Sequence, residues 1–446
     1  MFVRKILWLL LLAALGVPVA ARAQEGPNVR RGTPERHGRL WAEQEECSLP
    51  VKSGGRLVLR ADLGSITVRT CTADEIQCVV RLTAYTPAES EARVNFQHTE
   101  LTARRTGSGD AYLQLRYNDQ GRMRRLGVAF DLQVPAHCNL DLETAGGGIQ
   151  VVALDGELRA VTAGGAIRTG DVSGPVRVES AGGDIDLGNI GQRLEARTAG
   201  GSIRVGNVNG DMYLETRGGE ILAGAIAGSV RARTAAGNIT LRSALGPVSA
   251  ESAGGRIQLG ECGAAVRAET AGGSIHLDSA RGRVEAQTAG GSIDLLRVMG
   301  AVRAVTAAGH ILAQIDADPQ SFGPSSLQST VGDVRVYLPG DLPLTIKALI
   351  DTAAGHAISS DFPLTVTHDA QEDFGLGPMD GRATLAGGGA PLNLRTTLGN
   401  IEIRRLDTNS AEHLKAYQQA FWKDWQQRMK ERQQQMEQML SQKGEP

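Results

Sequence analysis

Between residues 144 and 323, apolar and polar residues alternate in short runs that repeat every 18 residues. A Thr or Ser opens each repeat and recurs ten times without an insertion or a deletion. These positions are Thr144, Thr162, Ser180, Thr198, Thr216, Thr234, Ser252, Thr270, Thr288 and Thr306. A fixed period this short is typical of a solenoid, in which each repeat forms one coil and stacks on the previous one.

Each repeat contains two alternating runs, and each run follows a glycine. Alternation with a period of two predicts β-strands with one buried face, and the glycines predict tight turns between them. We therefore expect an all-β fold, a single parallel β-solenoid that is regular over 144–323 and irregular over 324–406. One coil cannot bury the apolar side of its own strands, so the stacked neighbours must supply the core.

One column of the repeat contains isoleucine in every coil. It consists of Ile149, Ile167, Ile185, Ile203, Ile221, Ile239, Ile257, Ile275, Ile293 and Ile311. Residues two apart share a face of a strand, so we expect this column to form the inside of the solenoid. The predicted core is narrow, because Tyr213 is the only aromatic residue between 144 and 321.

The outward columns carry charges of alternating sign. One column reads Glu179, Arg197, Glu215, Arg233 and Glu251 along successive coils. Equivalent residues of stacked coils lie about 4.8 Å apart, where opposite charges attract and like charges repel. The alternation therefore supports the 18-residue superposition, although Glu269, the next residue of the column, breaks it.

The segments that flank the repeat have different compositions. We expect residues 24–39 to be a flexible start. An open sheet edge promotes aggregation, so the ends of a solenoid need caps, and we expect residues 40–143 to form a β cap at the first end. The segment 409–443 lacks Gly and Pro and predicts an amphipathic helix. Its apolar stripe consists of Leu414, Tyr417, Phe421, Trp425, Met429, Met436 and Leu440. This helix could cap the solenoid end, join subunits as a short coiled coil, or lie on a membrane surface.

The first 23 residues are typical of a secretory signal peptide. Arg4 and Lys5 precede an apolar stretch over 6–20, and Ala21-Arg22-Ala23 forms a cleavage site. The apolar stretch is short for a membrane span. We therefore expect export to the periplasm, the outer surface or the extracellular medium, with no transmembrane span in the mature chain.

Five cysteines remain after cleavage of the signal peptide. Four of them, Cys47, Cys71, Cys78 and Cys138, cluster before residue 140 and can pair in three ways. Cys71 and Cys78 flank a turn-like stretch, so a hairpin-spanning disulfide between these two is the favoured pair. Cys262 lies in an apolar column and is expected to be a small packing residue.

Several kinds of chemistry are excluded by the sequence. A net charge of −2 without a basic stripe argues against a nucleic-acid partner. The Ala-Gly-Gly turns precede strands and lack the lysine of a phosphate-binding loop, and no aspartate recurs as a calcium roll requires. Asp184 and Asp186 are the one carboxylate pair considered for glycoside hydrolysis, but Arg168 and Arg204 flank Asp186, which favours a charge ladder. We expect no catalytic, metal-binding or cofactor-binding residues and no cofactor.

A ligand site, if one exists, is expected in the first cap, where aromatic side chains are available for carbohydrate stacking. The candidates for a binding surface are Trp41, Tyr85, Tyr112 and Tyr117. The alternative is that these four residues form the core of the cap.

Three motifs frame the repeats: Gly64-Ser65-Ile66-Thr67-Val68, the Val134-Pro135-Ala136 entry to 140–144, and Leu398-Gly399-Asn400-Ile401-Glu402-Ile403. With these motifs and the Thr-x-x-Gly-x-Ile repeats, the stretch 55–404 resembles the bacterial putative-adhesin β-solenoid family, a cell-envelope domain of unknown function. The resemblance implies a right-handed parallel solenoid and no catalytic residues.

We therefore expect an exported, non-catalytic β-solenoid that serves as an envelope or surface scaffold with an adhesive role. The main alternative is a glycan- or protein-binding module, and a weaker one is a polysaccharide-cleaving β-helix enzyme. The expected partners are a second copy of the chain through 409–443, an envelope polysaccharide or a surface protein.

Overall fold

The computed structural model describes residues 28–408, with gaps at 107–108, 119–124, 321 and 369–375, and scattered positions between 412 and 434. The expected signal peptide over 1–23 lies outside the described residues. Export therefore stays a prediction.

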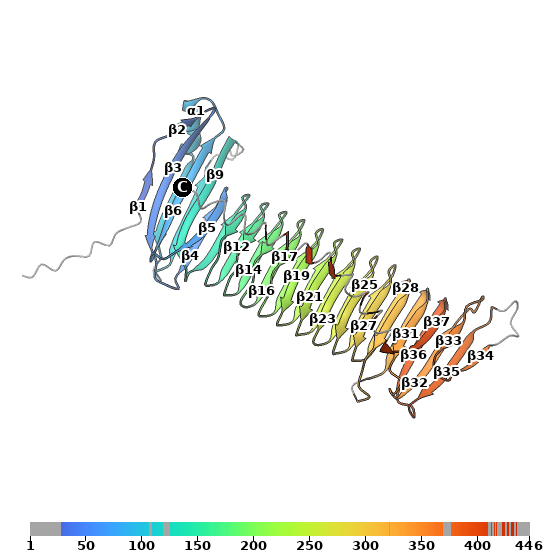
Figure 1. Ribbon diagram of the computed structural model, residues 1–446. Coiled ribbons are helices and arrows are strands. Elements are labelled where there is room, and N and C mark those ends of the chain that lie inside the picture. The colour runs from blue at the N-terminus through green and yellow to red at the C-terminus, as the bar shows by residue number, and fades with distance from the viewer. Residues whose placement is uncertain are drawn as a thin grey trace, which may run out of the picture.

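The repeats form a rod of stacked coils (Figure 1). Each coil contributes one strand to each of two long sheets, here called sheet A and sheet B. Neighbouring coils pair in parallel, and residues 18 apart are partners, as in Ile149 with Ile167 and Leu158 with Val176. The predicted parallel β-solenoid of 18-residue coils is confirmed.

The strands of the regular rod alternate between the two sheets. Sheet A contains β11 (Ile149–Val151), β13 (Ile167–Thr169), β15 (Ile185–Leu187), β17 (Ile203–Val205), β19 (Ile221–Ile226), β21 (Ile239–Ala244), β23 (Ile257–Cys262), β25 (Ile275–Ala280), β27 (Ile293–Val298) and β29 (Ile311–Ile315). Sheet B contains β10 (Asn139–Thr144), β12 (Leu158–Thr162), β14 (Val176–Ser180), β16 (Leu194–Thr198), β18 (Met212–Thr216), β20 (Val230–Thr234), β22 (Val248–Ser252), β24 (Val266–Thr270), β26 (Val284–Thr288) and β28 (Val302–Ala308).

The core of the rod lies between the two sheets. The isoleucine column, from Ile149 to Ile311, is at most 1% exposed in every coil. Sheet B contributes small buried side chains such as Ala160 and Ala196. Sheet B also contributes larger buried side chains such as Leu158 and Leu194, so aliphatic residues of both sheets fill the core.

A hydroxyl and a glycine shape each Thr-Ala-Gly-Gly corner. Thr198 Oγ1 donates a hydrogen bond to the carbonyl oxygen of Gly183 at 2.9 Å, and equivalent bonds recur along the rod. A Cβ at Gly183 would lie closer than 3.0 Å to backbone atoms of Gly165, whereas a Cβ at Gly182 would lie 3.9 Å from its nearest neighbour. The second glycine of the corner is therefore required, because coils stack in backbone contact there.

At the N-terminal end, two further coils stack on the regular rod in an order that differs from the chain order. β4 (Arg56–Ala61) and β5 (Ser65–Cys71) pair in parallel with β10 and β11. β8 (Ala111–Tyr117) and β9 (Leu126–Pro135) pair with β4 and β5 on their far side. The first of these coils is thus inserted between the later one and the rod, and α1 (Glu89–Gln97) lies at this end (Figure 1).

Antiparallel strands cover the N-terminal sheet edges. β6 (Glu75–Ala84) and β3 (Leu40–Pro50) extend sheet A beyond β9, and β7 (Thr99–Arg105) extends sheet B beyond β8. β1 (Asn28–Arg31) and β2 (Glu35–His37) both pair with β3. The prediction of a flexible start over 24–39 is therefore wrong for residues 28–37, because the open backbone groups of β3 provide hydrogen-bond partners for them.

The C-terminal end has the same interchange of coils. β30 (Ser325–Val331) and β31 (Val334–Leu338) continue the stack, and the last strands of the chain, β36 (Ala390–Leu398) and β37 (Ile401–Arg405), stack next. β32 (Leu344–Ile350) and β33 (Ile358–Ser360) lie beyond them. β35 (Met379–Leu385) and β34 (Thr365–His368) then extend sheet B in antiparallel pairing.

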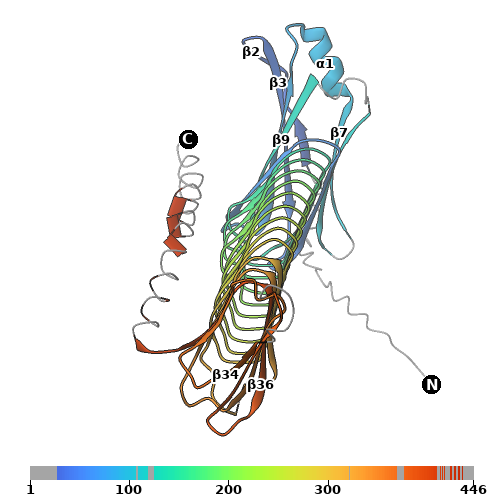
Figure 2. The ribbon, with the colours of Figure 1, turned by 90° about the vertical axis from the view of Figure 1, so that its right-hand side faces the viewer.

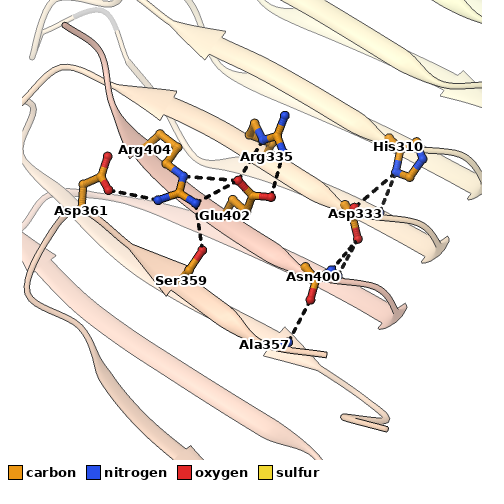
Figure 3. Close-up of polar contacts among 9 residues, drawn as sticks. All are labelled: His310, Asp333, Arg335, Ala357, Ser359, Asp361, Asn400, Glu402 and Arg404. Carbon is orange, nitrogen blue, oxygen red and sulfur yellow. Dashed lines mark hydrogen bonds and ion pairs between the residues drawn. The ribbon is translucent and has the colours of Figure 1, made fainter. Parts of the chain in front are cut away.

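Polar ladders connect these last coils of sheet A (Figure 3). Arg335 donates two hydrogen bonds to the carboxylate of Glu402, at 2.8 and 3.0 Å, and these bonds hold the pKa of Glu402 below its ordinary value. Arg404 donates to Glu402 at 3.1 Å and to Asp361 at 3.2 Å. A second ladder at the adjoining turn consists of His310, Asp333, Asn400 and the backbone of Ala357.

The C-terminal helix lies beside the rod (Figure 2). Trp422 donates a hydrogen bond from Nε1 to the carboxylate of Asp278 on β25, and the guanidinium of Arg242 lies 5.2 Å from the Trp422 ring centre. The described part of the helix therefore covers a flank of sheet A, and the idea that it caps the solenoid end is wrong. Among the described residues, no helix combines the length and apolar character that crossing a membrane requires.

Candidate functional site

The outer face of sheet B carries a groove that follows the rod axis. Two adjoining hollows of about 700 and 730 Å³ share Glu215 and Arg217 and together extend from Arg60 to Val305. The groove follows the corner where each sheet B strand enters its Thr-Ala-Gly-Gly turn. Its wall is the outward column that contains the alternating charges, and its floor is the column of alanines that follow the Thr or Ser.

Ion pairs between stacked coils form the wall of the groove. The guanidinium of Arg197 lies 3.8 Å from the carboxylate of Glu179 and 3.5 Å from that of Glu215. Arg233 likewise lies 3.0 Å from Glu251. These residues are direct partners in the strand register, so the structure confirms the alternation that the sequence indicated.

Two adjacent glutamates break this alternation, and neighbouring arginines reduce the repulsion between their carboxylates. Glu251 and Glu269 are direct partners in adjacent strands. Glu251 pairs with Arg233, whose hydrogen bond lowers the pKa of the Glu251 carboxyl, and Glu269 pairs with Arg267 at 2.5 Å. Each carboxylate has its own counter-ion, which reduces their mutual repulsion.

The middle of the groove differs from the rest of it. Arg217 replaces the alanine of the floor, is exposed, and lines both hollows. The other nine repeats have alanine there: Ala145, Ala163, Ala181, Ala199, Ala235, Ala253, Ala271, Ala289 and Ala307. Within the described part of the chain, Arg217 forms no ion pair. Nearby, Tyr213 donates from its hydroxyl to Glu215 at 2.6 Å, and Arg197 lies 4.9 Å from its ring centre.

The aromatic residues that were candidates for a binding surface do not gather at one place. Trp41 is on β3 and half-buried, and Tyr85 follows β6 with 57% exposure, so both belong to the sheet A side. Tyr112 and Tyr117 are on β8 of sheet B. Tyr117 is 3% exposed and belongs to the core, while Tyr112 lies under Arg104 at 4.5 Å.

The predicted disulfide between Cys71 and Cys78 is wrong. β9 lies between β5 and β6, where it pairs Cys71 with Pro135 and Cys78 with Leu132. Two strand spacings amount to about 9.6 Å, which a disulfide cannot span. The short connection after Cys71 suggested a hairpin. It joins β5 and β6, which are not neighbouring strands in the sheet. The structure contains no disulfide bond among the five cysteines, and burial raises the pKa of Cys262 to about 12.

The carboxylates considered for glycoside hydrolysis have structural partners. Asp184 accepts a hydrogen bond from the backbone N–H of Ser202 in the next coil at 2.8 Å. Asp186 stands in register between Arg168 and Arg204. Among the described residues, no cluster of three or more His, Cys, Asp or Glu is arranged to hold a metal ion.

The opposite flank of the rod, on sheet A, contains a strip of buried outward residues. Leu222, Thr240, Gln258 and His276 of one outward column are at most 8% exposed. Earlier members of this column, such as Arg168 and Arg204, are charged and exposed or half-buried. The change from arginine to Leu, Thr and Gln along the column is a signal in the sequence for a covered face, and the sequence-based prediction overlooked it.

A buried ion pair anchors the helix on this strip. His276 and Asp278 are each 1% exposed, and His276 Nε2 lies 3.1 Å from Asp278 Oδ1. Burial lowers the pKa of His276, but the neighbouring carboxylates of Asp278 and Asp294 outweigh this effect and the net direction is upward. The raised pKa favours the charged imidazole beside the carboxylate of Asp278, which also accepts the indole hydrogen bond of Trp422.

Replacing Trp422 with alanine is expected to detach the helix while the rod stays folded. The change removes the hydrogen bond to Asp278 and the contact with Arg242, and an anchoring Trp commonly contributes about 2 kcal/mol or more. Limited trypsin digestion should then cleave near Lys423 much faster than in the unmodified chain. The exposed neighbour change Lys430→Ala is the control, and equal digestion rates for Trp422→Ala and the control would contradict the anchor.

The chain has little detectable similarity to known proteins. No family model matches the chain, and no curated protein matches it. Among solved structures, the chain is similar to a "putative cell adhesion protein" from Clostridium sporogenes. The match covers 84% of this chain and 100% of that chain, with 8% sequence identity and a TM-score of 0.14. At this level the likeness carries no functional argument, so function is inferred from the residues of this chain.

Proposed function

We propose that this chain is an exported, non-catalytic surface scaffold with an adhesive role. In this proposal the rod holds an extended ligand, such as an envelope polysaccharide, along the groove of sheet B. The single observation that carries it is the length of the groove, which runs past successive coils from Arg60 to Val305. A groove of this form suits a polymer rather than a small molecule, because ligand pockets for small molecules are compact and enclosed.

The chemistry of the groove supports binding rather than catalysis. The glutamates of its wall are held in ion pairs with arginines of the same or adjacent coils, as Glu179 and Glu215 are with Arg197. Its Thr and Ser hydroxyls donate to glycine carbonyls in the corners. A general acid would need a carboxyl whose pKa is raised, whereas the pKa of Glu251 in the groove is lowered.

Arg217 is the residue most suited to contact a ligand. Its side chain is exposed at the middle of the groove, where it lines both hollows. A guanidinium donates several hydrogen bonds in a planar fork, which suits the carboxylates or phosphates of an acidic polysaccharide.

The substitution Arg217→Ala tests this proposal without disturbing the fold, since it restores the residue of the other nine repeats. We expect the unmodified chain to bind one member of a panel of envelope polysaccharides saturably, measured with immobilised protein. Arg217→Ala should weaken this binding about tenfold or more, because hydrogen bonds to charged groups contribute roughly 1.5–3 kcal/mol. Arg382→Ala, which removes the same charge from β35 at the rod end, should leave binding unchanged.

Two results would count against the proposal. Equal affinities of Arg217→Ala and Arg382→Ala would place the ligand outside the groove. Sustained release of new reducing ends from a polysaccharide, lost in Asp184→Asn or Asp186→Asn, would instead identify a polysaccharide-cleaving enzyme.

A further inference from the structure

The strand register places two cysteines directly opposite each other in the N-terminal cap. Cys47 on β3 and Cys78 on β6 are partners in the antiparallel pair. Directly opposed residues of antiparallel strands have Cα atoms about 4.5–5.5 Å apart, and disulfides form over about 4.4–6.8 Å. The backbone therefore already has the spacing that a disulfide requires.

Both side chains point to the same inner face of the cap. Cys47 is 5% exposed and Cys78 is 1% exposed, in strands whose alternate residues are buried. Interaction with Cys47, together with burial, raises the pKa of the Cys78 thiol. The register and the shared buried face thus bring the two thiols to neighbouring positions in the cap.

The other cysteines have no such counterpart. Cys71 is opposite Pro135, and Cys262 lies between Ala244 and Ala280 of adjacent coils. Cys138 lies in the bend before β10. Cys47 and Cys78 are thus the one register-opposed pair among the five cysteines, all of which lie in the described part of the chain.

We propose that Cys47 and Cys78 form a cross-strand disulfide that locks the N-terminal cap. The Sγ–H bonds of both residues break and one Sγ–Sγ bond forms. The two electrons and two protons reduce a low-molecular-weight disulfide, such as oxidised glutathione, to two thiols. The cross-link joins β3, which carries β1 and β2, to β6, and so fastens the strands that cover the edge of sheet A.

The position of the proposed disulfide allows it to hold the covering strands on the edge of sheet A. An ion pair of Arg31 with Glu43 and Glu45 already holds β1 against β3. The disulfide adds a covalent tie one strand further in, between β3 and β6. Strands at a sheet edge are the first to peel away, so this tie keeps the edge covered. The inference does not depend on the proposed ligand groove.

The test is a thiol map of the purified full chain after refolding with oxidised glutathione. Free thiols are blocked with iodoacetamide in denaturant, and the chain is cut with trypsin and then beside Asp74 or Glu75, which separates Cys71 from Cys78. We expect three alkylated cysteines and one linked pair of peptides that contains Cys47 and Cys78. Five alkylated thiols, or a link that includes Cys71, Cys138 or Cys262, would overturn the proposal.

Two variants make the result specific. Cys71→Ser should retain the linked peptides, and the double variant Cys47→Ala and Cys78→Ala should lose them. A reductant should lower the melting temperature of the unmodified chain but not that of the double variant. If the double variant does not fold, the peptide map of the unmodified chain still decides the question.

Discussion

Replacing Ile221 with aspartate is expected to unfold the middle of the rod. Ile221 is 1% exposed and lies between Ile203 and Ile239 of the adjacent coils. The new carboxylate would have no buried partner in this aliphatic column, and an uncompensated buried charge costs roughly 3–5 kcal/mol. Because each coil is stabilised mainly by its neighbours, the loss spreads along the stack. Thermal unfolding followed by circular dichroism measures the effect.

The matched control is Arg233→Ala on the neighbouring sheet. Arg233 pairs with Glu251 at 3.0 Å, but its side chain is 40% exposed. A surface ion pair contributes about 1 kcal/mol or less, so the melting temperature should change little. Similar melting temperatures for both variants would contradict the placement of the isoleucine column inside the rod.

Replacing Gly183 with alanine is expected to disrupt the stacking of two coils. The added methyl group would meet the backbone of Gly165 closer than 3.0 Å, and hydrogen bonds with the Ser180 and Thr198 hydroxyls hold both backbones in place. Overpacking of this kind costs about 3 kcal/mol or more when the obstacle is backbone. Chemical denaturation of the full chain measures the change in the free energy of unfolding.

The control for this prediction is the preceding residue of the same corner. A Cβ at Gly182 would lie 3.9 Å from the nearest atom, and the equivalent positions in two other repeats are Ala236 and Ala308. Gly182→Ala should therefore change the free energy of unfolding by about 0.5 kcal/mol or less. If Gly183→Ala were as stable as Gly182→Ala, the coils could not be in backbone contact at this corner.

The candidate groove was only partly predictable from the sequence. The alternating charges of its wall follow from the period, and so does the exception at Glu269. The sequence also contains the substitution of Arg217 into the alanine column, but the period alone does not reveal that this column is the floor of a groove. That requires the shape of the corner, which depends on how the backbone turns between the two sheets.

The ends of the rod were the least predictable part. Local pattern identified strands around Cys71 and Cys78, yet β9, which comes later in the chain, separates them. Likewise, β36 and β37 stack before β32 and β33. Strand order at a sheet edge depends on long-range pairing and on how the edge is covered, and local periodicity contains no information on either.

The repeat pattern is sufficient to specify the coil. Side-chain alternation fixes which face is buried, and an uninterrupted period of 18 residues fixes which residues become neighbours, so Ile149 to Ile311 could form only an internal column. Long-range contacts alone decide the partner of Cys78, the contact of Trp422 with β25, and the exchanged coils at both ends. These features bring together residues that are far apart in the chain. The 18-residue repeat does not relate their positions in the sequence, so it cannot predict that they pair.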